Sequence, residues 1–181
     1  MPERMRCEME QGQFQIYTGD GKGKTTAAIG LAVRAAGAGL RVYIGQFIKD
    51  MEYSEVSVLR KAGIAVELYG TGKGCLIGKN PTQEDRDAAD RGMRRAGEIL
   101  CSQRYDLVIC DEINVAFQLH LLTEEQLMGL VQKKPASVEL VFTGRGCPQK
   151  VLEQADLVTE MREIKHYYRT KGLLARKGIE S

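Results

Sequence analysis

The segment TGDGKGKTT, residues 18–26, combines glycines, lysines and threonines in the manner of a phosphate-binding loop. Alternating glycines allow a tight turn and a close approach of phosphate to backbone N–H groups. Lys24 would supply a positive charge to the phosphates, and the Thr25 hydroxyl is placed to reach a bound Mg²⁺. The usual pattern, G-x-x-x-x-G-K-[ST], has a glycine where this chain has Thr18. A glycine-rich turn with incidental lysines is the alternative, but GKTT falls between a predicted strand and a predicted helix, which favours a phosphate site.

A second candidate group is the acidic pair Asp111-Glu112, which directly follows the apolar run LVIC. Ligands of open α/β sheets bind at the carboxyl ends of strands, so we expect this pair to face the phosphate loop. One carboxylate would hold Mg²⁺ directly or through water, and the other would be a second metal contact or a base. For Asp111 alone, a helix N-cap is the alternative. In a chain with a phosphate loop, the metal role is the better interpretation.

Basic residues follow two further predicted strands. Arg145 lies in TGRGCP, residues 143–148, and its guanidinium suits paired hydrogen bonds to a phosphate. A surface arginine in a turn explains this residue equally well. The segment QFIKD, residues 46–50, has a similar position and gives weaker evidence.

Strands and helices alternate along the chain, which indicates how these groups are brought together. Predicted strands cover residues 14–18, 40–47, 64–69, 106–112, 138–144 and 156–161. Predicted helices cover residues 24–36, 54–62, 82–102, 123–132 and 149–154, with Thr82 as N-cap and Asp85 in a capping-box position. This alternation predicts an α/β fold, P-loop NTPase-like (RecA-like), with a mostly parallel sheet and helices on both faces. We expect a single domain over residues 1–181, with an N-terminal arm at 1–12 and a basic tail at 162–181 that is not obviously helical.

The composition argues against several classes of protein. A formal charge of +2 over 181 residues is too small to indicate nucleic acid as a partner through electrostatics alone. No run approaches the roughly 18 apolar residues that cross a membrane, and the charged N-terminus has no apolar signal segment, so we expect a cytoplasmic protein. Five scattered cysteines without a C-x-x-C pair and only two histidines argue against structural zinc, a disulfide framework and a histidine-rich metal site. We therefore expect free thiols.

Taken in order, these motifs resemble one family, the corrinoid adenosyltransferases of the phosphate-loop type. That family begins with T-G-x-G-K-G-K-T-T-A-A, and this chain has TGDGKGKTTAA, so Thr18 belongs to the family pattern. The similarity continues through QFIK, DLVICDE, TGRGCP and DLVTEM to IKHYYRTKGLLARKGIE, and it covers almost the whole chain.

The resemblance implies a reaction in which the Co(I) centre of a reduced corrinoid attacks the ribose C5′ of ATP and expels triphosphate. The phosphate loop would then stabilise the departing triphosphate, which in this family lies in the reverse sense to that of ordinary phosphate-loop enzymes. The residues implied to bind ATP are Thr18, Gly19, Asp20, Gly21, Lys22, Gly23, Lys24, Thr25, Thr26 and Arg145. Those implied to act in catalysis are Lys24, Thr25, Glu112 and Arg145, and those implied to hold Mg²⁺ or Mn²⁺ are Thr25, Asp111 and Glu112.

The resemblance also implies partners and a cellular role. It places the reaction in adenosylcobalamin biosynthesis or salvage, with residues 162–181 on the corrinoid side of the site. It implies a homodimer and a flavoprotein reductase that supplies Co(I). Neither a nucleic acid nor a membrane is expected as a partner.

The corrinoid side departs from the family pattern. Many members carry G-x-G-F-x-W, whose aromatics are thought to occupy the lower axial face of the corrinoid, where this chain has GKGCLI. The corresponding candidate corrinoid contacts are Gly74, Cys75, Leu76 and Ile77. Leu76 or Ile77 would exclude an axial ligand by apolar bulk. Cys75 is either a cobalt-facing thiol or a loop residue, and we favour the loop residue. Near the end, the family's H-P-Y is replaced by His166-Tyr167-Tyr168, and Ser181 stands in place of a frequent aromatic residue.

The sequence leaves two other functions open. A P-loop ATPase or nucleotide-dependent kinase would use Glu112 to orient water or an acceptor hydroxyl and Arg145 to stabilise the transferring phosphoryl group. A non-catalytic corrinoid carrier or chaperone would explain the departures at Cys75 and Ile77. Only the enzyme hypotheses require turnover to depend on Lys24.

Overall fold

The computed structural model describes residues 9–49, 51–71 and 80–180. Its strands are β1 (Phe14–Thr18), β2 (Val42–Phe47), β3 (Ala65–Tyr69), β4 (Leu107–Asp111), β5 (Glu139–Thr143) and β6 (Leu157–Glu160). Its helices are α1 (Lys24–Gly37), α2 (Ser54–Lys61), α3 (Gln83–Ser102), α4 (Ile113–Gln118), α5 (Glu124–Gln132), α6 (Gln149–Leu152) and α7 (Tyr167–Lys171).

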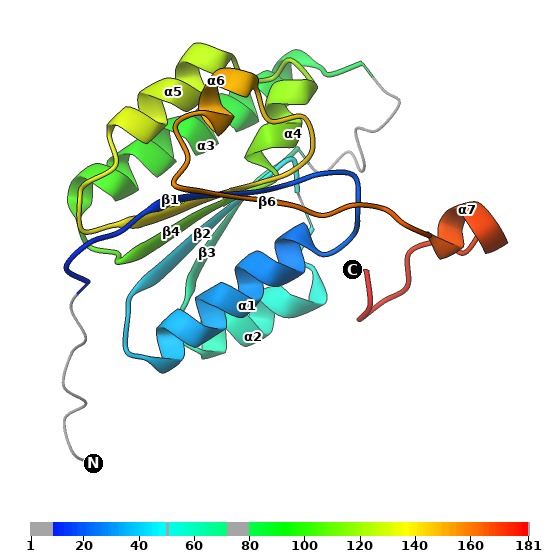
Figure 1. Ribbon diagram of the computed structural model, residues 1–181, viewed down its shortest axis with the longest axis horizontal. Coiled ribbons are helices and arrows are strands. Elements are labelled where there is room, and N and C mark those ends of the chain that lie inside the picture. Colours follow the sequence, from blue (N-terminus) through cyan, green and yellow to red (C-terminus); the bar gives the residue numbers. More distant parts are fainter. Residues whose placement is uncertain (1–8, 50, 72–79, 181) are drawn as a thin grey trace.

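The strands form one sheet in the order β3-β2-β4-β5-β1-β6, and every neighbouring pair is parallel. Helices α1 and α2 cover one face, and α3, α4, α5 and α6 cover the other (Figure 1). The predicted parallel α/β sheet with helices on both faces is therefore confirmed. Because all strands run the same way, their carboxyl ends meet at one edge, where the phosphate loop and the acidic pair both lie.

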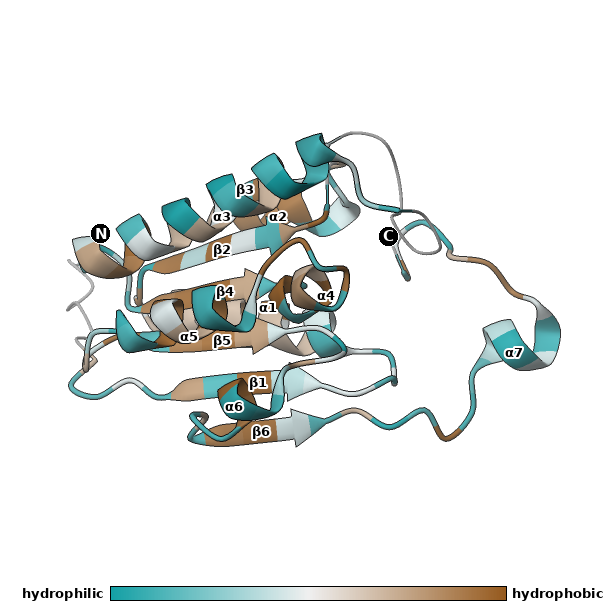
Figure 2. Ribbon diagram, turned by 90° about the horizontal axis from the view of Figure 1, so that it is seen from above, coloured by the Kyte–Doolittle hydropathy of each residue, from teal (hydrophilic) through white to brown (hydrophobic). Residues whose placement is uncertain are grey.

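Alternate residues of the central strands enter two separate cores. In β4, Leu107 and Ile109 pack with α1 and α2, whereas Val108 and Cys110 pack with the helices of the opposite layer. Side chains of a strand alternate between its faces, and a strand buried on both faces is apolar throughout. The strands accordingly appear as largely hydrophobic ribbons between helices that are hydrophilic outside (Figure 2). This doubly covered sheet fixes the strand ends that carry the site.

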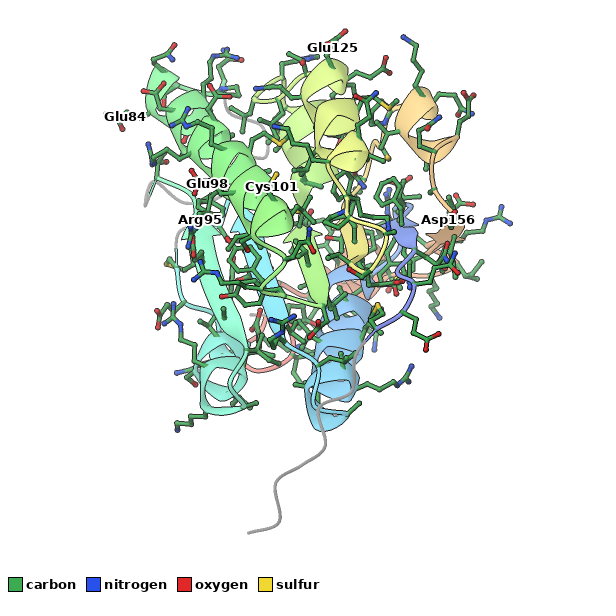
Figure 3. The ribbon with its side chains drawn as sticks, turned by 90° about the vertical axis from the view of Figure 1, so that its left-hand side faces the viewer. Glu84, Arg95, Glu98, Cys101, Glu125 and Asp156 are labelled. Carbon is green, nitrogen blue, oxygen red and sulfur yellow. The ribbon has the colours of Figure 1, made fainter. Side chains whose placement is uncertain are left out.

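The long helix α3 begins where the sequence predicted. Thr82 Oγ1 accepts a hydrogen bond of 3.4 Å from the backbone N–H of Asp85, and the Asp85 carboxylate accepts one of 2.8 Å from the N–H of Thr82. This reciprocal pair is the predicted capping box. Further along α3, Arg95 donates to the carboxylate of Glu67 on β3 at 3.1 Å, and Figure 3 labels it beside that strand. The helix is thus fixed at its start by local bonds and along its length by contact with the sheet.

Two short helices differ from the sequence prediction. The segment after the acidic pair forms α4, which was not predicted, and the tail contains α7 although it had no obvious helical pattern. Helices of six and five residues are too short for the apolar spacing that marks longer helices in a sequence. Small shifts occur elsewhere, since β2 starts at Val42 and α6 ends at Leu152. The predicted ends of β1, β2 and β3 are unchanged, and those of β4, β5 and β6 each move by one residue, to Asp111, Thr143 and Glu160.

Within the described ranges, no helix is long and apolar enough to cross a bilayer. Three of the cysteines, Cys101, Cys110 and Cys147, are free. Burial raises the pKa of Cys147 to about 12, so this thiol stays protonated at neutral pH. Cys7 and Cys75 lie outside the described residues.

Candidate functional site

The phosphate-loop segment leaves β1 and turns sharply before it enters α1. Gly19 and Gly23 have φ values of 92° and 117°, in the left-handed region that favours glycine. The N–H of Gly21 donates to the carbonyl oxygen of Met161 at 2.6 Å, and a Cβ at Gly21 would approach that oxygen to 2.7 Å. The glycines therefore allow the loop to pass close to the end of β6.

Lys24 lies inside this loop. Its ammonium donates to the carbonyl oxygens of Gly19 and Gly21, both at 2.7 Å, and the residue is 7% exposed. Burial lowers the pKa of Lys24, and repulsion from Arg145 adds to the effect. The loop thus holds a buried cation among backbone groups, an arrangement that suits a polyphosphate.

Asp111, at the end of β4, connects the loop to two other strands. Its Oδ1 accepts hydrogen bonds from Thr25 at 2.8 Å and from Thr143 at 2.7 Å. Its Oδ2 accepts from Gln46 at 3.0 Å and from the ammonium of Lys49 at 2.8 Å. The aspartate is 1% exposed, so these four donors replace water around a buried charge.

Electrostatic attraction keeps both Asp111 and Lys49 ionised although they are buried. Burial would raise the pKa of Asp111, but Lys49 and the two threonine hydroxyls outweigh burial and hold the pKa below its ordinary value. Burial would lower the pKa of Lys49, yet the attraction and hydrogen bond of Asp111 raise it. Each group therefore stabilises the charge of the other.

Glu112, the next residue, points its carboxylate elsewhere. It occupies the N-cap position of α4 with no side-chain capping bond, and its N–H donates to Thr143 Oγ1 at 2.8 Å. Burial, together with the charge of Asp111, raises the pKa of Glu112. Among the residues that the structure describes, no hydrogen bond to this carboxylate is formed, and Glu112 lines the cavity described below.

Two residues at the site have a strained backbone. Glu112 has a φ of 61°, and the β-branched Ile48, just before Lys49, has a φ of 67°. Positive φ at residues other than glycine costs about 1–3 kcal/mol and is frequent at functional sites. Two of the four described non-glycine residues with positive φ are therefore at the site, where they position Lys49 and the Glu112 carboxylate.

A cavity of about 670 Å³ lies in front of these groups. One wall is the loop from Gly21 to Thr26, and a second, largely apolar wall contains Ile29 and Val33 of α1 with Val58 of α2. Its charged residues include Lys22, Lys24, Lys49, Glu55, Glu112, Arg145 and Glu180. Polyphosphate and an apolar ring system could both find complementary surfaces here.

The other predicted ATP residues lie around this cavity. Arg145 lines it, 54% exposed at its side chain, and its Nε lies 4.0 Å from the carboxylate of Asp20. Thr18, Gly19 and Asp20 are in the loop but are not among the cavity-lining residues. The candidate corrinoid contacts Gly74, Cys75, Leu76 and Ile77 lie outside the described residues.

Sequence reasoning missed part of this arrangement. Thr143 was quoted only as the start of TGRGCP, Gln46 and Lys49 only as a weak segment, and Glu180 only as part of the tail. The rule that ligands bind at the carboxyl ends of strands, applied to every predicted strand, would have found two of them, because Gln46 and Thr143 lie at the ends of β2 and β5.

Comparison with known proteins identifies the family. A family model described as ATP:corrinoid adenosyltransferase BtuR/CobO/CobP matches residues 10–181. The chain belongs to this family. A corrinoid adenosyltransferase of Escherichia coli K12 is 34% identical, and the match covers 97% of this chain and 88% of that protein. A corrinoid adenosyltransferase of Pseudomonas aeruginosa is 33% identical, and the match covers 94% of this chain and 84% of that protein. An uncharacterized protein of Nostoc sp. is 35% identical over 98% of this chain, which spans 50% of that protein's length.

This adenosyltransferase-family chain also shares its fold with a solved structure. The flagellar accessory protein FlaH from Methanocaldococcus jannaschii matches with a TM-score of 0.55 and 12% identity, covering 83% of this chain and 71% of that one. At this identity the likeness shows the fold alone, and it agrees with the predicted P-loop NTPase-like class. The resemblance first drawn from motifs is confirmed, and the family favours adenosyl transfer over the ATPase or kinase alternative.

Proposed function

We propose that the chain transfers the 5′-deoxyadenosyl group of ATP to the Co(I) centre of a reduced corrinoid and releases triphosphate. The observation that carries this proposal is the family match over residues 10–181 together with a phosphate loop hydrogen-bonded to the acidic strand end. In this reaction an electron pair of Co(I) forms the new Co–C5′ bond. The C5′–O bond breaks, and its electron pair leaves with triphosphate, so cobalt becomes formally Co(III).

The phosphate loop would bind the leaving group. Backbone N–H groups of residues 22–26, the Lys24 ammonium and the Thr26 hydroxyl offer donors at the start of α1, and Arg145 faces the same cavity. Such donors stabilise the negative charge that develops on triphosphate as the bond breaks. The rest of the rate enhancement would come from holding cobalt close to C5′ and opposite the departing oxygen. No proton has to be transferred at the reacting atoms.

A Mg²⁺ or Mn²⁺ ion fits the oxygen donors of the site. Such ions prefer hard oxygen ligands and are usually bound by one or two carboxylates plus substrate phosphates. The Thr25 hydroxyl and the Glu112 carboxylate would hold the ion, while Asp111, with both oxygens already hydrogen-bonded, would position Thr25. When bound, the ion would neutralise charge on triphosphate.

The remaining parts of the proposal concern partners. We infer that residues 74–77 and part of the C-terminal segment contact the corrinoid, and that a flavoprotein reductase supplies Co(I). A cytoplasmic homodimer is also proposed, and exposed apolar side chains of β6 and the tail, Leu157, Val158 and Leu174, support a second copy as partner. Sedimentation at micromolar concentration should give about twice the chain mass of 20.1 kDa; a species of 20.1 kDa alone would remove the dimer.

The activity is tested with ATP, Mg²⁺ and chemically reduced corrinoid. We expect a cobalt–carbon product and inorganic triphosphate in equal amounts. ADP and phosphate without alkylated cobalt would overturn the proposal in favour of an ATPase or kinase.

A pair of lysine variants separates an enzyme from a corrinoid carrier. Lys24→Ala should reduce turnover about 100-fold or more, the effect of removing one donor to a developing anion, while corrinoid binding is retained. Lys150→Ala is the matched control, since Lys150 lies on α6, pairs with Glu124 and does not line the cavity. Equal turnover in both variants would contradict the assignment of Lys24.

A further inference from the structure

The C-terminal segment 162–180 returns to the phosphate loop after leaving the sheet. It passes beyond the carboxyl ends of the strands, forms α7 and turns back toward the phosphate loop (Figure 1). The contact is made by Lys22, whose ammonium donates to Glu180 at 2.8 Å and to the Tyr167 hydroxyl at 3.0 Å. Lys22 and Glu180 are separated by 158 residues in the chain.

Glu180 is the acceptor around which this contact is organised. Its carboxylate accepts from the N–H of Arg176 at 2.8 Å and from the Arg176 guanidinium at 3.1 Å, as well as from the Tyr167 hydroxyl and Lys22. These bonds, with Arg176 the strongest, hold the pKa of Glu180 well below its ordinary value. Its side chain is only 15% exposed, against 41% for Lys22. One carboxylate therefore joins α7, the last turn of the chain and the phosphate loop.

This contact closes one side of the cavity. His166, Gly178, Ile179 and Glu180 line the same 670 Å³ space as residues 21–26 of the phosphate loop. The C-terminal segment is therefore a wall of the nucleotide cavity as well as a candidate corrinoid contact. Removing the segment would leave the loop open to solvent on that side.

We propose that Glu180 is a positioning residue that closes the C-terminal segment over the phosphate loop, and that triphosphate binding and this closure stabilise each other. The inference rests on the proposed function only in taking a triphosphate as the ligand of the loop. An ammonium has three donors, and those of Lys22 reach Glu180, Tyr167 and, at 3.4 Å, the carbonyl of Ile179. The longest of the three can be exchanged for a phosphate oxygen while the other two keep the segment closed.

Closure also has a favourable charge balance. Lys22 and Arg176 together carry two positive charges against the one negative charge of Glu180. The closed contact therefore keeps both cations beside Glu180, near the loop to which triphosphate adds negative charge. Because coupling between two equilibria is reciprocal, a ligand that binds the closed form more tightly must also favour closure.

The test compares Glu180→Gln with Glu163→Gln in the full chain. Glu163 lies in the same segment but pairs with Arg169 and is not a cavity-lining residue. Trypsin cleavage at Lys171, Arg176 and Lys177 is followed by intact mass, with and without millimolar inorganic triphosphate, whose affinity is measured by calorimetry. Thermal unfolding of each variant verifies that it is folded.

In the wild type and Glu163→Gln, triphosphate should slow cleavage of the segment. In Glu180→Gln, basal cleavage should rise and triphosphate affinity should fall, each by about twofold to fivefold, the range for an exposed ion pair. The protection by triphosphate should also disappear. Faster cleavage with unchanged triphosphate affinity would mean that Glu180 only anchors the tail, and it would overturn the proposed coupling. Cleavage equal to that of Glu163→Gln would overturn the closure itself.

A double-variant cycle provides an independent test. Lys22→Met and Glu180→Gln each remove the ion pair, so the increase in basal cleavage of the double variant should be smaller than the two single increases combined. Independent, fully combined increases would contradict the direct contact. None of these measurements uses a corrinoid, so a failure of adenosyl transfer would be seen separately from a failure of closure.

Discussion

The Thr25 hydroxyl, in the first turn of α1, donates a hydrogen bond of 2.8 Å to Oδ1 of Asp111 at the end of β4. This bond ties the phosphate loop to the acidic strand end. The second carboxylate oxygen is held by Lys49 and Gln46 of the neighbouring strand and its following loop. The site is therefore organised by a buried ion pair, whose removal has consequences that can be measured.

Asp111→Asn should destabilise the protein without nucleotide by about 3 kcal/mol, because it leaves the ammonium of Lys49 buried without its counter-charge. Lys49→Met should be destabilising for the converse reason. In the double variant the loss should be clearly smaller than the sum of the two single losses, since both charges are then absent. Urea unfolding, followed by circular dichroism, gives the free energy of unfolding of the wild type, the two single variants and the double variant. Strictly additive losses would contradict the coupling of Asp111 and Lys49.

Two glycine substitutions should have effects of opposite sign. Gly19→Ala places a Cβ about 2.5 Å from the carbonyl oxygen of Met161 at a φ of 92°, so it should destabilise the loop by about 1–3 kcal/mol and weaken ATP binding. Gly30→Ala lies within α1 with nothing within 4 Å of its new Cβ, and it should stabilise the protein by about 0.5–1 kcal/mol. Thermal unfolding and nucleotide titration compare the two variants. A stable Gly19→Ala protein with normal ATP affinity would show that the loop does not have this backbone conformation at residue 19.

The ion pair between Glu67 and Arg95 should make stability depend on acid pH. Burial would raise the pKa of Glu67, but hydrogen bonds from Arg95 and Tyr69 outweigh burial and lower it below 4.5. A carboxyl group with a lowered pKa stabilises the fold above its unfolded pKa, and the contribution is lost as pH falls through the folded pKa. Because the Glu67 side chain is 37% exposed, Glu67→Gln should lose about 0.5–1 kcal/mol at pH 7.

The difference between wild type and Glu67→Gln should therefore shrink steadily from pH 5 to pH 3. Urea midpoints across this range measure it. Glu98→Gln is the control, because Glu98 also bonds to Arg95 but is 66% exposed at its side chain. A difference that is constant with pH would exclude a charged role for Glu67.

The fold and the centre of the site could be predicted because their signals are local. A strand, a glycine-rich turn and a helix follow one another within residues 14–36, and the pair after LVIC is adjacent in sequence. The capping box at Thr82 is likewise contained within four residues. Each of these features depends on neighbours along the chain, so a single sequence is sufficient to recognise it.

The remaining contacts depend on strand order, which the alternation of elements does not specify. Gln46 and Thr143 reach Asp111 only because β2 and β5 lie on either side of β4. The contact between Lys22 and Glu180 depends on the path of the whole C-terminal segment. The positive φ of Ile48 leaves no mark in the sequence, since a β-branched residue is among the least expected there.

Asp111 and Glu112 differ in their hydrogen bonding, and metal removal tests which of them contacts the ion. Asp111 has its oxygens hydrogen-bonded, whereas the Glu112 carboxylate faces the cavity without such a bond among the described residues. Chelation by EDTA should abolish adenosyl transfer, and Mg²⁺ or Mn²⁺ should restore it. Glu112→Gln should raise the Mg²⁺ concentration required for half-maximal activity at least about 10-fold, since even groups that only orient metal ligands affect affinity 10- to 100-fold.

Glu124→Gln is the matched control for Glu112→Gln, because Glu124 of α5 pairs with Lys150 of α6 and does not line the cavity. Its Mg²⁺ dependence should equal that of the wild type. If Glu112→Gln also keeps the wild-type dependence while Asp111→Asn loses it, the metal contact belongs to Asp111, and Lys49 must then move away when the ion binds. The two carboxylates are adjacent in the chain, but their different hydrogen bonding predicts that only one of them sets the metal requirement.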